Sequence, residues 1–195
     1  MANTTKRGFR WHSSKNGAKA PPIRWVHVAD DYATKLVKGD ALKFVTDGLE
    51  RAAAGDAIIC GVMVGAWYWD GTVFKPSSFV PASTSYDTNL SRQTKVGFIP
   101  VGGQIFEVDA DDGVTATTEA GYLAFINENA DHIVESGSLN ISYMALDISD
   151  HKTATAQWRI VGISKYPNHD FASSRVKLLV ECNESAEPTY ATAGS

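Results

Sequence analysis

Short runs in which apolar and polar residues alternate recur along this chain of 195 residues, and turn-forming Gly, Asp, Asn and Ser separate them. In the run 176–182, every second residue from Val176 is apolar, whereas Lys177 and Glu181 hold polar positions between them. A two-residue period of this kind is typical of a β-strand with one buried face. The pattern predicts strands over Arg24–Val28, Ala41–Val45, Ala57–Val64, Thr72–Phe74, Lys95–Val101, Gln104–Val108, Gln157–Ile163 and Val176–Cys182.

Strands this short, divided by turn signals, predict a mainly β fold, either a small antiparallel β-barrel or a sandwich. Signals for helices are few. Residues 50–54 have good helical propensity but span only one turn, and residues 117–124 are compatible with a short helix on a threonine cap, ending near Asn127–Asn129. The length suits one domain with its own core.

The two ends of the chain have a different composition. Residues 1–23 are polar and basic and contain Pro21 and Pro22, and residues 185–195 are also polar. We therefore predict an extended basic N-terminal arm over 1–23, a β-barrel domain over 24–184 and a flexible C-terminal tail over 185–195. No apolar segment follows the charged first residues, and the longest apolar run, 57–69, is interrupted by glycines. We expect a soluble protein made in the cytoplasm.

Charge is distributed unevenly along the chain. The net charge is −4, which argues against bulk nucleic-acid binding, yet all 22 acidic residues lie after residue 29. Three interpretations of the basic arm stay open: it lies on its own acidic body, it reaches an acidic patch on a neighbouring subunit, or it contacts RNA or DNA. Its basic residues are Lys6, Arg7, Arg10, Lys15, Lys19 and Arg24.

Sequence motifs of catalysis and cofactor binding are missing. The chain contains no nucleotide-binding glycine loop, no G-x-S-x-G nucleophile motif and no H-E-x-x-H zinc motif. Its two cysteines, Cys60 and Cys182, are far apart and form no C-x-x-C pair, so we predict buried, reduced thiols. We expect no catalysis, no cofactor and no metal.

Some acidic residues and histidines could form a metal site or a catalytic acid–base pair. The cluster Asp109–Gly113 suggests a calcium loop, but its glycine comes fifth rather than sixth, which favours an acidic turn. His151 follows Asp147 and Asp150, and His169 precedes Asp170, so either imidazole could serve as a base or a metal ligand. Without a nucleophile or third ligand at motif spacing, polar loop residues are the preferred interpretation.

Aromatic residues cluster before the turn at Asp70-Gly71. Trp67, Tyr68 and Trp69 are consecutive, so in a hairpin at least one ring faces each side. Exposed rings of this kind stack on sugars or bases, or pack between subunits. His27 alternates with Trp25 on a predicted strand, which favours a partly buried structural histidine.

Several segments, taken in order, carry a resemblance to a known family. They are Ala2–Arg10, Leu36–Lys43, Ala52–Gly65, Gly102–Val108, Leu146–Asp147, Thr155–Gly162 and Leu178–Asn183, with Pro167–Asp170 after a late strand. The ordered set resembles the capsid decoration, or cement, proteins of tailed bacteriophages, of the β-tulip type, and covers most of residues 1–183. The insert Trp67–Trp69 does not match the family.

This resemblance implies a virion structural protein on the outer surface of the capsid. Such a protein binds the phage major capsid protein, stabilises contacts between capsomers and carries out no catalysis. Its other expected partner is itself, as a homotrimer, and no nucleic acid or membrane is expected. Many copies on a symmetric shell make weak single contacts collectively strong.

Cations and aromatic rings near the N-terminus are the expected capsid or subunit contacts. The alternative for Phe9 and Trp11 is that they pack on their own domain. If the arm is the anchor, deletion of residues 1–23 should leave a folded domain that no longer binds capsids. The predicted contact residues are Arg7, Phe9, Arg10, Trp11 and Arg24, with Trp67, Tyr68 and Trp69 as a further aromatic surface.

Two other function classes stay open. One is a different virion module, a head-fibre base or a receptor- or carbohydrate-binding knob that uses Trp67–Trp69. The other is a small β-barrel enzyme that uses His151 or His169 with a neighbouring aspartate.

Overall fold

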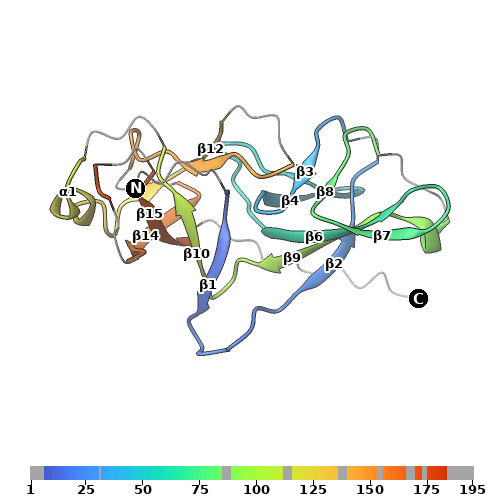
Figure 1. Ribbon diagram of the computed structural model, residues 1–195, viewed down its shortest axis with the longest axis horizontal. Helices are drawn as coiled ribbons and strands as arrows, with labels where there is room; N and C mark the ends of the chain where they lie inside the picture. The colour runs from blue at the N-terminus through green and yellow to red at the C-terminus, as the bar shows by residue number, and fades with distance from the viewer. Residues whose placement is uncertain are drawn as a thin grey trace.

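The computed structural model describes residues 7–30, 32–84, 89–111, 116–135, 140–152, 156–165, 170–172 and 175–183. Over these residues the chain is mainly β, with antiparallel pairing throughout its sheets, which confirms the predicted fold class. Two larger sheets lie next to each other along the long axis of the molecule (Figure 1).

The first sheet contains strands from both ends of the described chain, in the order β1-β10-β15-β14-β11. A two-stranded hairpin, β12-β13, and the short helix α1 accompany it. Thr118 caps this helix by accepting a hydrogen bond from the amide of Gly121, as the threonine signal indicated. The bounds are β1 Arg10–Ser14, β10 Gln104–Asp109, α1 Glu119–Leu123, β11 Asn129–Ala130, β12 His132–Val134, β13 Met144–Leu146, β14 Trp158–Ile163 and β15 Lys177–Cys182.

The second sheet is built from the middle of the chain, in the order β2-β9-β6-β4-β5, and β7 pairs with β6. The separate pair β3-β8 accompanies it, and a 3-10 turn, η1, precedes β9. The bounds are β2 Arg24–His27, β3 Leu36–Val37, β4 Ala41–Val45, β5 Gly48–Arg51, β6 Gly61–Trp69, β7 Phe74–Ser77, β8 Phe79–Val80, η1 Leu90–Arg92 and β9 Lys95–Pro100.

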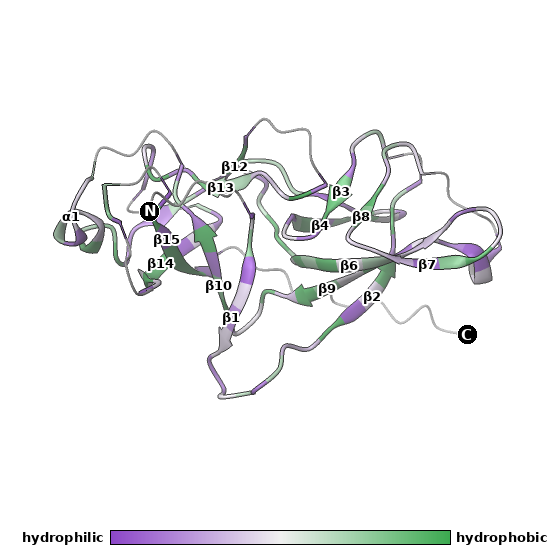
Figure 2. Cartoon of the chain, viewed as in Figure 1, coloured by the Kyte–Doolittle hydropathy of each residue, from purple (hydrophilic) through white to green (hydrophobic). Residues whose placement is uncertain are grey.

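Neither sheet closes into a barrel in the part of the chain that the structure describes; both are open and resemble the layers of a sandwich. One hydrophobic core is shared: Phe106, Trp158 and Leu178 of the first sheet pack in a cluster with Val62 and Ile99 of the second. Figure 2 shows the matching concentration of hydrophobic residues on β6, β9, β10 and β14. A smaller second core lies between the second sheet and the β3-β8 pair; it includes Leu36, Leu42, Met63, Val80 and Phe98.

Most predicted strands recur with modest shifts of their bounds, but the predicted Thr72–Phe74 shares only Phe74 with β7. The predicted arm does not hold for residues 7–14. β1 pairs with β10 as an antiparallel strand of the first sheet, and Phe9 is only 2% exposed. The ring of Phe9 stacks on Trp158 at 4.3 Å between centroids. Because β1 is mostly hydrophilic (Figure 2), its alternation is too weak to stand out from a loop. The domain boundary at residue 23 is therefore wrong, whereas residues 1–6 and the tail lie outside the described residues.

Two other differences concern local propensity. Residues 50–54 form the end of β5 and a turn rather than a helical turn, because β4 supplies ladder partners for Gly48–Arg51. β6 begins at Gly61 rather than Ala57 and extends to Trp69, since it pairs with β9 on one side and with β4 and β7 on the other. Tertiary pairing overrides the local signal in both places.

A close crossing joins the two sheets at the N-terminal segment. The amide of Phe9 donates to the carbonyl of Gly39 at 2.9 Å, and Gly8 and Gly39 both adopt positive φ, +60° and +97°. A Cβ at Gly8 would collide with Ser142. Ser142 Oγ in turn donates to the buried carboxylate of Asp40 at 2.7 Å. Glycine is required here because the backbones approach closely in a conformation that other residues rarely adopt.

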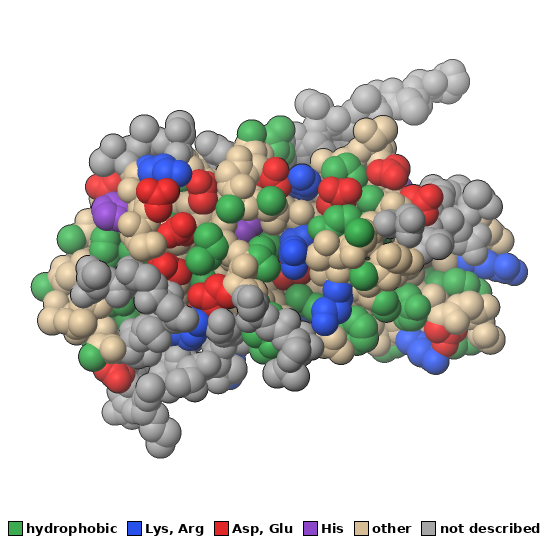
Figure 3. Space-filling model, turned by 90° about the horizontal axis from the view of Figure 1, so that it is seen from above, with side chains coloured by type: hydrophobic (Ala, Val, Ile, Leu, Met, Phe, Trp, Pro, Cys, Tyr) green, Lys and Arg blue, Asp and Glu red, His purple; other side chains and the backbone are tan. Residues whose placement is uncertain are grey.

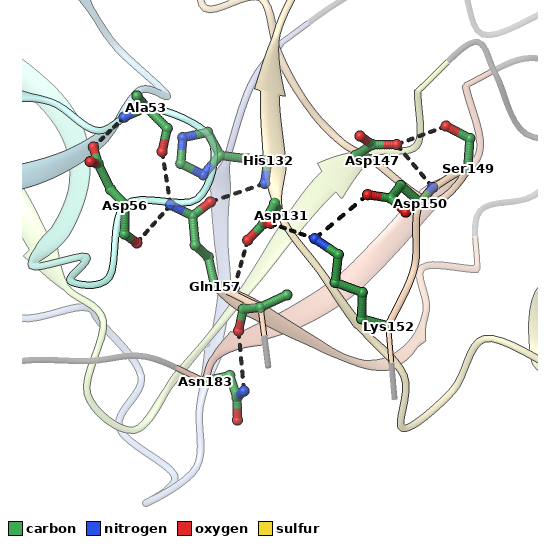
Figure 4. Close-up of polar contacts among 11 residues, drawn as sticks. Ala53, Asp56, Asp131, His132, Asp147, Ser149, Asp150, Lys152, Gln157 and Asn183 are labelled. Carbon is green, nitrogen blue, oxygen red and sulfur yellow. Dashed lines mark hydrogen bonds and ion pairs between the residues drawn. The ribbon is translucent and has the colours of Figure 1, made fainter. Parts of the chain in front are cut away.

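A second polar junction centres on Gln157, which is fully buried (Figure 4). Its side-chain amide donates to the carbonyls of Ala53 and Asp56, at 2.8 and 2.9 Å, and its side-chain oxygen accepts from the amide of His132. The amide of Gln157 also donates to Asp131. One side chain therefore ties the β5-β6 loop of the second sheet to β12 and β14.

Among the described residues, no helix is long and apolar enough to cross a membrane.

Candidate functional site

A groove of about 610 Å³ opens where the N-terminal segment crosses the second sheet. Arg7, Arg10 and Lys38 stand at its rim as exposed side chains, and Val62 and Ile99 contribute apolar floor. The groove exists because β1 forms the edge of the first sheet while the preceding residues run over Gly39. Segments far apart in the sequence, near residues 7, 38, 62 and 140, therefore line one hollow.

The rim of this groove carries positive charge with little internal compensation. Arg10 Nη1 lies 3.7 Å from Glu107 Oε1, a long contact for an ion pair. Arg7 and Lys38 have no ion-pair partner among the described residues. On the face seen from above, Figure 3 shows acidic and basic side chains interspersed with apolar ones. In a protein of net charge −4, a rim with two unpaired cations marks a place that attracts an anionic group.

Trp11 forms the wall of the groove rather than a free anchor. Its indole Nε1 donates to the side-chain oxygen of Gln104 at 2.8 Å, and its ring packs against the shared core. Gln104 is buried and also donates to Ser14 Oγ. The ring is thereby held in one orientation.

Four of the five predicted contact residues meet at this groove, and one does not. Arg7, Arg10 and Trp11 present side chains there, whereas Phe9 lines it while its ring is buried in the shared core. Arg24 lies on β2, outside the groove lining, and is exposed. Sequence reasoning missed Lys38 and Asn140, because nothing local distinguishes them from ordinary turn residues.

The aromatic triplet lies at the far end of β6. Trp67 and Trp69 share one face of the β6-β7 hairpin and Tyr68 takes the other, which follows from the register with β7. Trp67 is 44% exposed. It lines a second hollow of about 380 Å³ together with Trp25, Phe74, Ser91 and Lys95. Sequence reasoning placed Trp25 on a strand but did not connect it with Trp67.

Two details fix this aromatic surface. Trp25 lies over Gly97, where a Cβ would come within 2.9–3.0 Å of the indole carbons, so only glycine lets the ring lie against the strand. At the hairpin turn, Asp70 accepts hydrogen bonds from the amides of Thr72 and Val73 and pairs with Lys75. The hydrogen bond from Lys75, with these amides, lowers the pKa of Asp70. The turn, and hence the position of Trp67, is well defined.

His151 does not pair with Asp147 or Asp150 in the part of the chain that the structure describes. His151 Nδ1 contacts the carbonyl of Ile148 at 2.9 Å and its ring packs on Phe125, whereas Asp147 accepts from Ser149 Oγ and the amide of Asp150. Asp150 pairs instead with Lys152 (Figure 4). His169 lies outside the described residues. His27 is partly buried on β2, on the same face as Trp25.

The acidic cluster is not an exposed turn where it is described. Asp109 ends β10 and is 1% exposed, and Asp111 is also buried, with its carboxylate accepting from the amide of Ile148. Residues 112 and 113 lie outside the described residues. Within the described ranges, no group of three or more His, Cys, Asp or Glu side chains is placed to hold a metal ion.

Both cysteines are free thiols, as predicted; Cys60 is buried, whereas Cys182 is only partly buried, which differs from the prediction. Burial raises the pKa of Cys60 to about 12, so its reactive thiolate form is scarce at neutral pH.

Comparison with known proteins adds no assignment: no protein-family model matches the chain, and no curated protein or solved structure is significantly similar to it.

Proposed function

We propose that this protein is a virion structural protein that binds the outer surface of a tailed-phage capsid and stabilises the contacts between capsomers. The role needs binding surfaces rather than a catalytic step. The proposal rests on the sequence resemblance to decoration proteins and on the groove at the N-terminal crossing. In this proposal the protein acts in the virion, associates with itself as a trimer, and has the major capsid protein as its partner.

The groove supports the proposal because its cationic rim and apolar floor favour one kind of bound segment. Arg7 and Lys38 form a cationic rim without described ion-pair partners, above an apolar floor that includes Val62 and Ile99. An extended acidic segment of a capsid subunit satisfies both features, with carboxylates at the rim and an apolar side chain on the floor. Trp11, held by Gln104, supplies a rigid aromatic wall of the kind that dominates many interfaces.

Charge reversal at the rim tests this assignment. The double variant Arg7→Glu/Lys38→Glu is expected to bind undecorated capsids at least about tenfold more weakly than the wild type, because two attractions become repulsions. Co-sedimentation of purified protein with the capsids measures the affinity. Higher salt should weaken wild-type binding, since the rim charges are exposed.

A matched control separates the groove from the overall charge. Lys19→Glu/Arg92→Glu changes the net charge equally at exposed cations outside the groove, and it should bind almost as the wild type does. Equal loss in both double variants, or no loss in the rim variant, would remove the groove from the proposal. Failure of the wild type to associate with any capsid would overturn the function itself.

The aromatic hollow favours a second candidate, a carbohydrate-binding virion module. Trp25, fixed over Gly97, and Trp67 offer exposed ring faces beside Ser91 and Lys95, an arrangement suited to stacking a sugar. In this case Trp25→Ala and Trp67→Ala should abolish glycan binding on an array, while rim variants leave it unchanged. If instead the rim variants lose capsid binding while Trp25→Ala and Trp67→Ala keep it, the result supports the decoration role.

A further inference from the structure

A buried lysine and a buried aspartate face each other across the central strands of the first sheet. Asp109 at the end of β10 and Lys177 at the start of β15 are direct partners in the antiparallel register. Lys177 Nζ lies 2.5 Å from Asp109 Oδ1, and the two side chains are only 10% and 2% exposed. No site or function described above uses this pair.

The surroundings of Asp109 disfavour its charged form. Asp109 Oδ2 is buried and has no hydrogen-bond partner among the described residues. Burial raises the pKa of the Asp109 carboxyl, although the hydrogen bond and charge of Lys177 act in the opposite direction. Glu107, two residues earlier on the same face of β10 and itself buried, raises that pKa further by charge repulsion. The protonated acid is thus favoured for Asp109, and Lys177 lies within hydrogen-bond distance as the nearest proton source.

We propose that Lys177 and Asp109 become joined by an intramolecular amide bond between Nζ and Cγ once the chain has folded. A proton first passes from the Lys177 ammonium to the Asp109 carboxylate, which gives a free amine and a carboxylic acid. The nitrogen lone pair then attacks Cγ, the C–N bond forms, and the Cγ–OH bond breaks. The departing hydroxyl takes one proton from the nitrogen, so one water molecule leaves and no oxidant or co-reactant is consumed.

The fold supplies what this condensation needs. Strand register holds the amine against the carboxyl, so the reaction is intramolecular at a fixed short distance, which raises its rate strongly over the same groups in solution. The site is also shielded from bulk water, which would otherwise solvate both charges. The product links β10 to β15 across 68 residues of sequence and restricts the unfolded chain as a disulfide of similar span does.

Mass spectrometry of the full chain tests the proposal. The intact mass of the purified, folded protein should be one water molecule below the sequence mass. Trypsin should fail to cleave after Lys177, so a branched peptide should join residues 96–152 to residues 176–195. A wild-type protein of full sequence mass that is cleaved normally after Lys177 would overturn the proposal.

Two controls distinguish the amide from an ion pair and from water loss elsewhere. Lys177→Arg retains the cation and its pairing, but a guanidinium is not acylated, so the variant should fold, show the full sequence mass and give no branched peptide. Within the wild type, the less buried pair Lys152–Asp131, at 3.2 Å, should stay free and be cleaved after Lys152. The same mass deficit in Lys177→Arg would place the lost water elsewhere and refute the assignment.

Discussion

Phe9→Ala is expected to lower the free energy of unfolding by about 3–5 kcal/mol, the range for removing a large aromatic ring from a core. The Phe9 ring is 2% exposed, stacks on Trp158 at 4.3 Å and meets His132 edge-on at 6.0 Å. Its removal leaves a cavity where the two sheets share their core. Urea denaturation followed by tryptophan fluorescence measures the change.

Deletion of residues 1–14 should have a still larger effect and yield a chain that does not fold. Besides Phe9, it removes β1, the edge strand that pairs with β10. As a control for Phe9→Ala, Trp67→Ala removes an aromatic ring that is exposed. It should lower the free energy of unfolding by less than about 1 kcal/mol. A truncated chain that remains cooperatively folded would show that the N-terminal segment is a dispensable arm after all.

The contribution of His132 to the free energy of unfolding should fall as the pH is lowered below 6.5, because this residue is buried in its neutral form. Burial lowers the pKa of His132 from its ordinary value of 6.5, against the hydrogen bond to the Ala52 carbonyl and the charges of Asp131 and Asp56; Arg51 lowers it further. Below pH 6.5 the His132 imidazole therefore binds a proton in the unfolded chain but stays neutral in the folded chain. The expected loss reaches about 1.4 kcal/mol per pH unit until the pKa of the folded state is passed.

His132→Gln isolates this contribution. The imidazole Nε2 contacts the Ala52 carbonyl at 3.0 Å, and Nδ1 accepts from the Trp158 indole at 3.3 Å; glutamine offers a donor and an acceptor but does not titrate. Burial raises the pKa of Asp40, and this residue shifts stability in the opposite direction as the pH falls. The test is therefore the difference between wild-type and variant urea midpoints from pH 7 to pH 5. A constant difference would show that protonation of His132 does not affect stability between pH 7 and pH 5.

Local pattern was enough to predict the elements whose two faces differ in chemistry. β4, β10 and β15 were predicted because alternate residues pack into a core, a signal that every stretch of the sequence carries by itself. The threonine cap of α1 was predicted for the same reason, since capping involves only neighbouring residues. The mainly β, antiparallel fold class follows from these local signals.

The tertiary structure alone decided which segments meet. The sequence pattern does not reveal β1, because a polar edge strand is recognised only by its partner, β10, whose paired residues lie 90 or more positions later. Alternation places Lys177 at a polar position of its strand, yet packing across that face buries it against Asp109. The groove joins Arg7 to Lys38 and Asn140 through the crossing at Gly8 and Gly39. Such contacts depend on the packing of distant segments, so alternation along the chain determined the strands, whereas three-dimensional packing determined the sites between them.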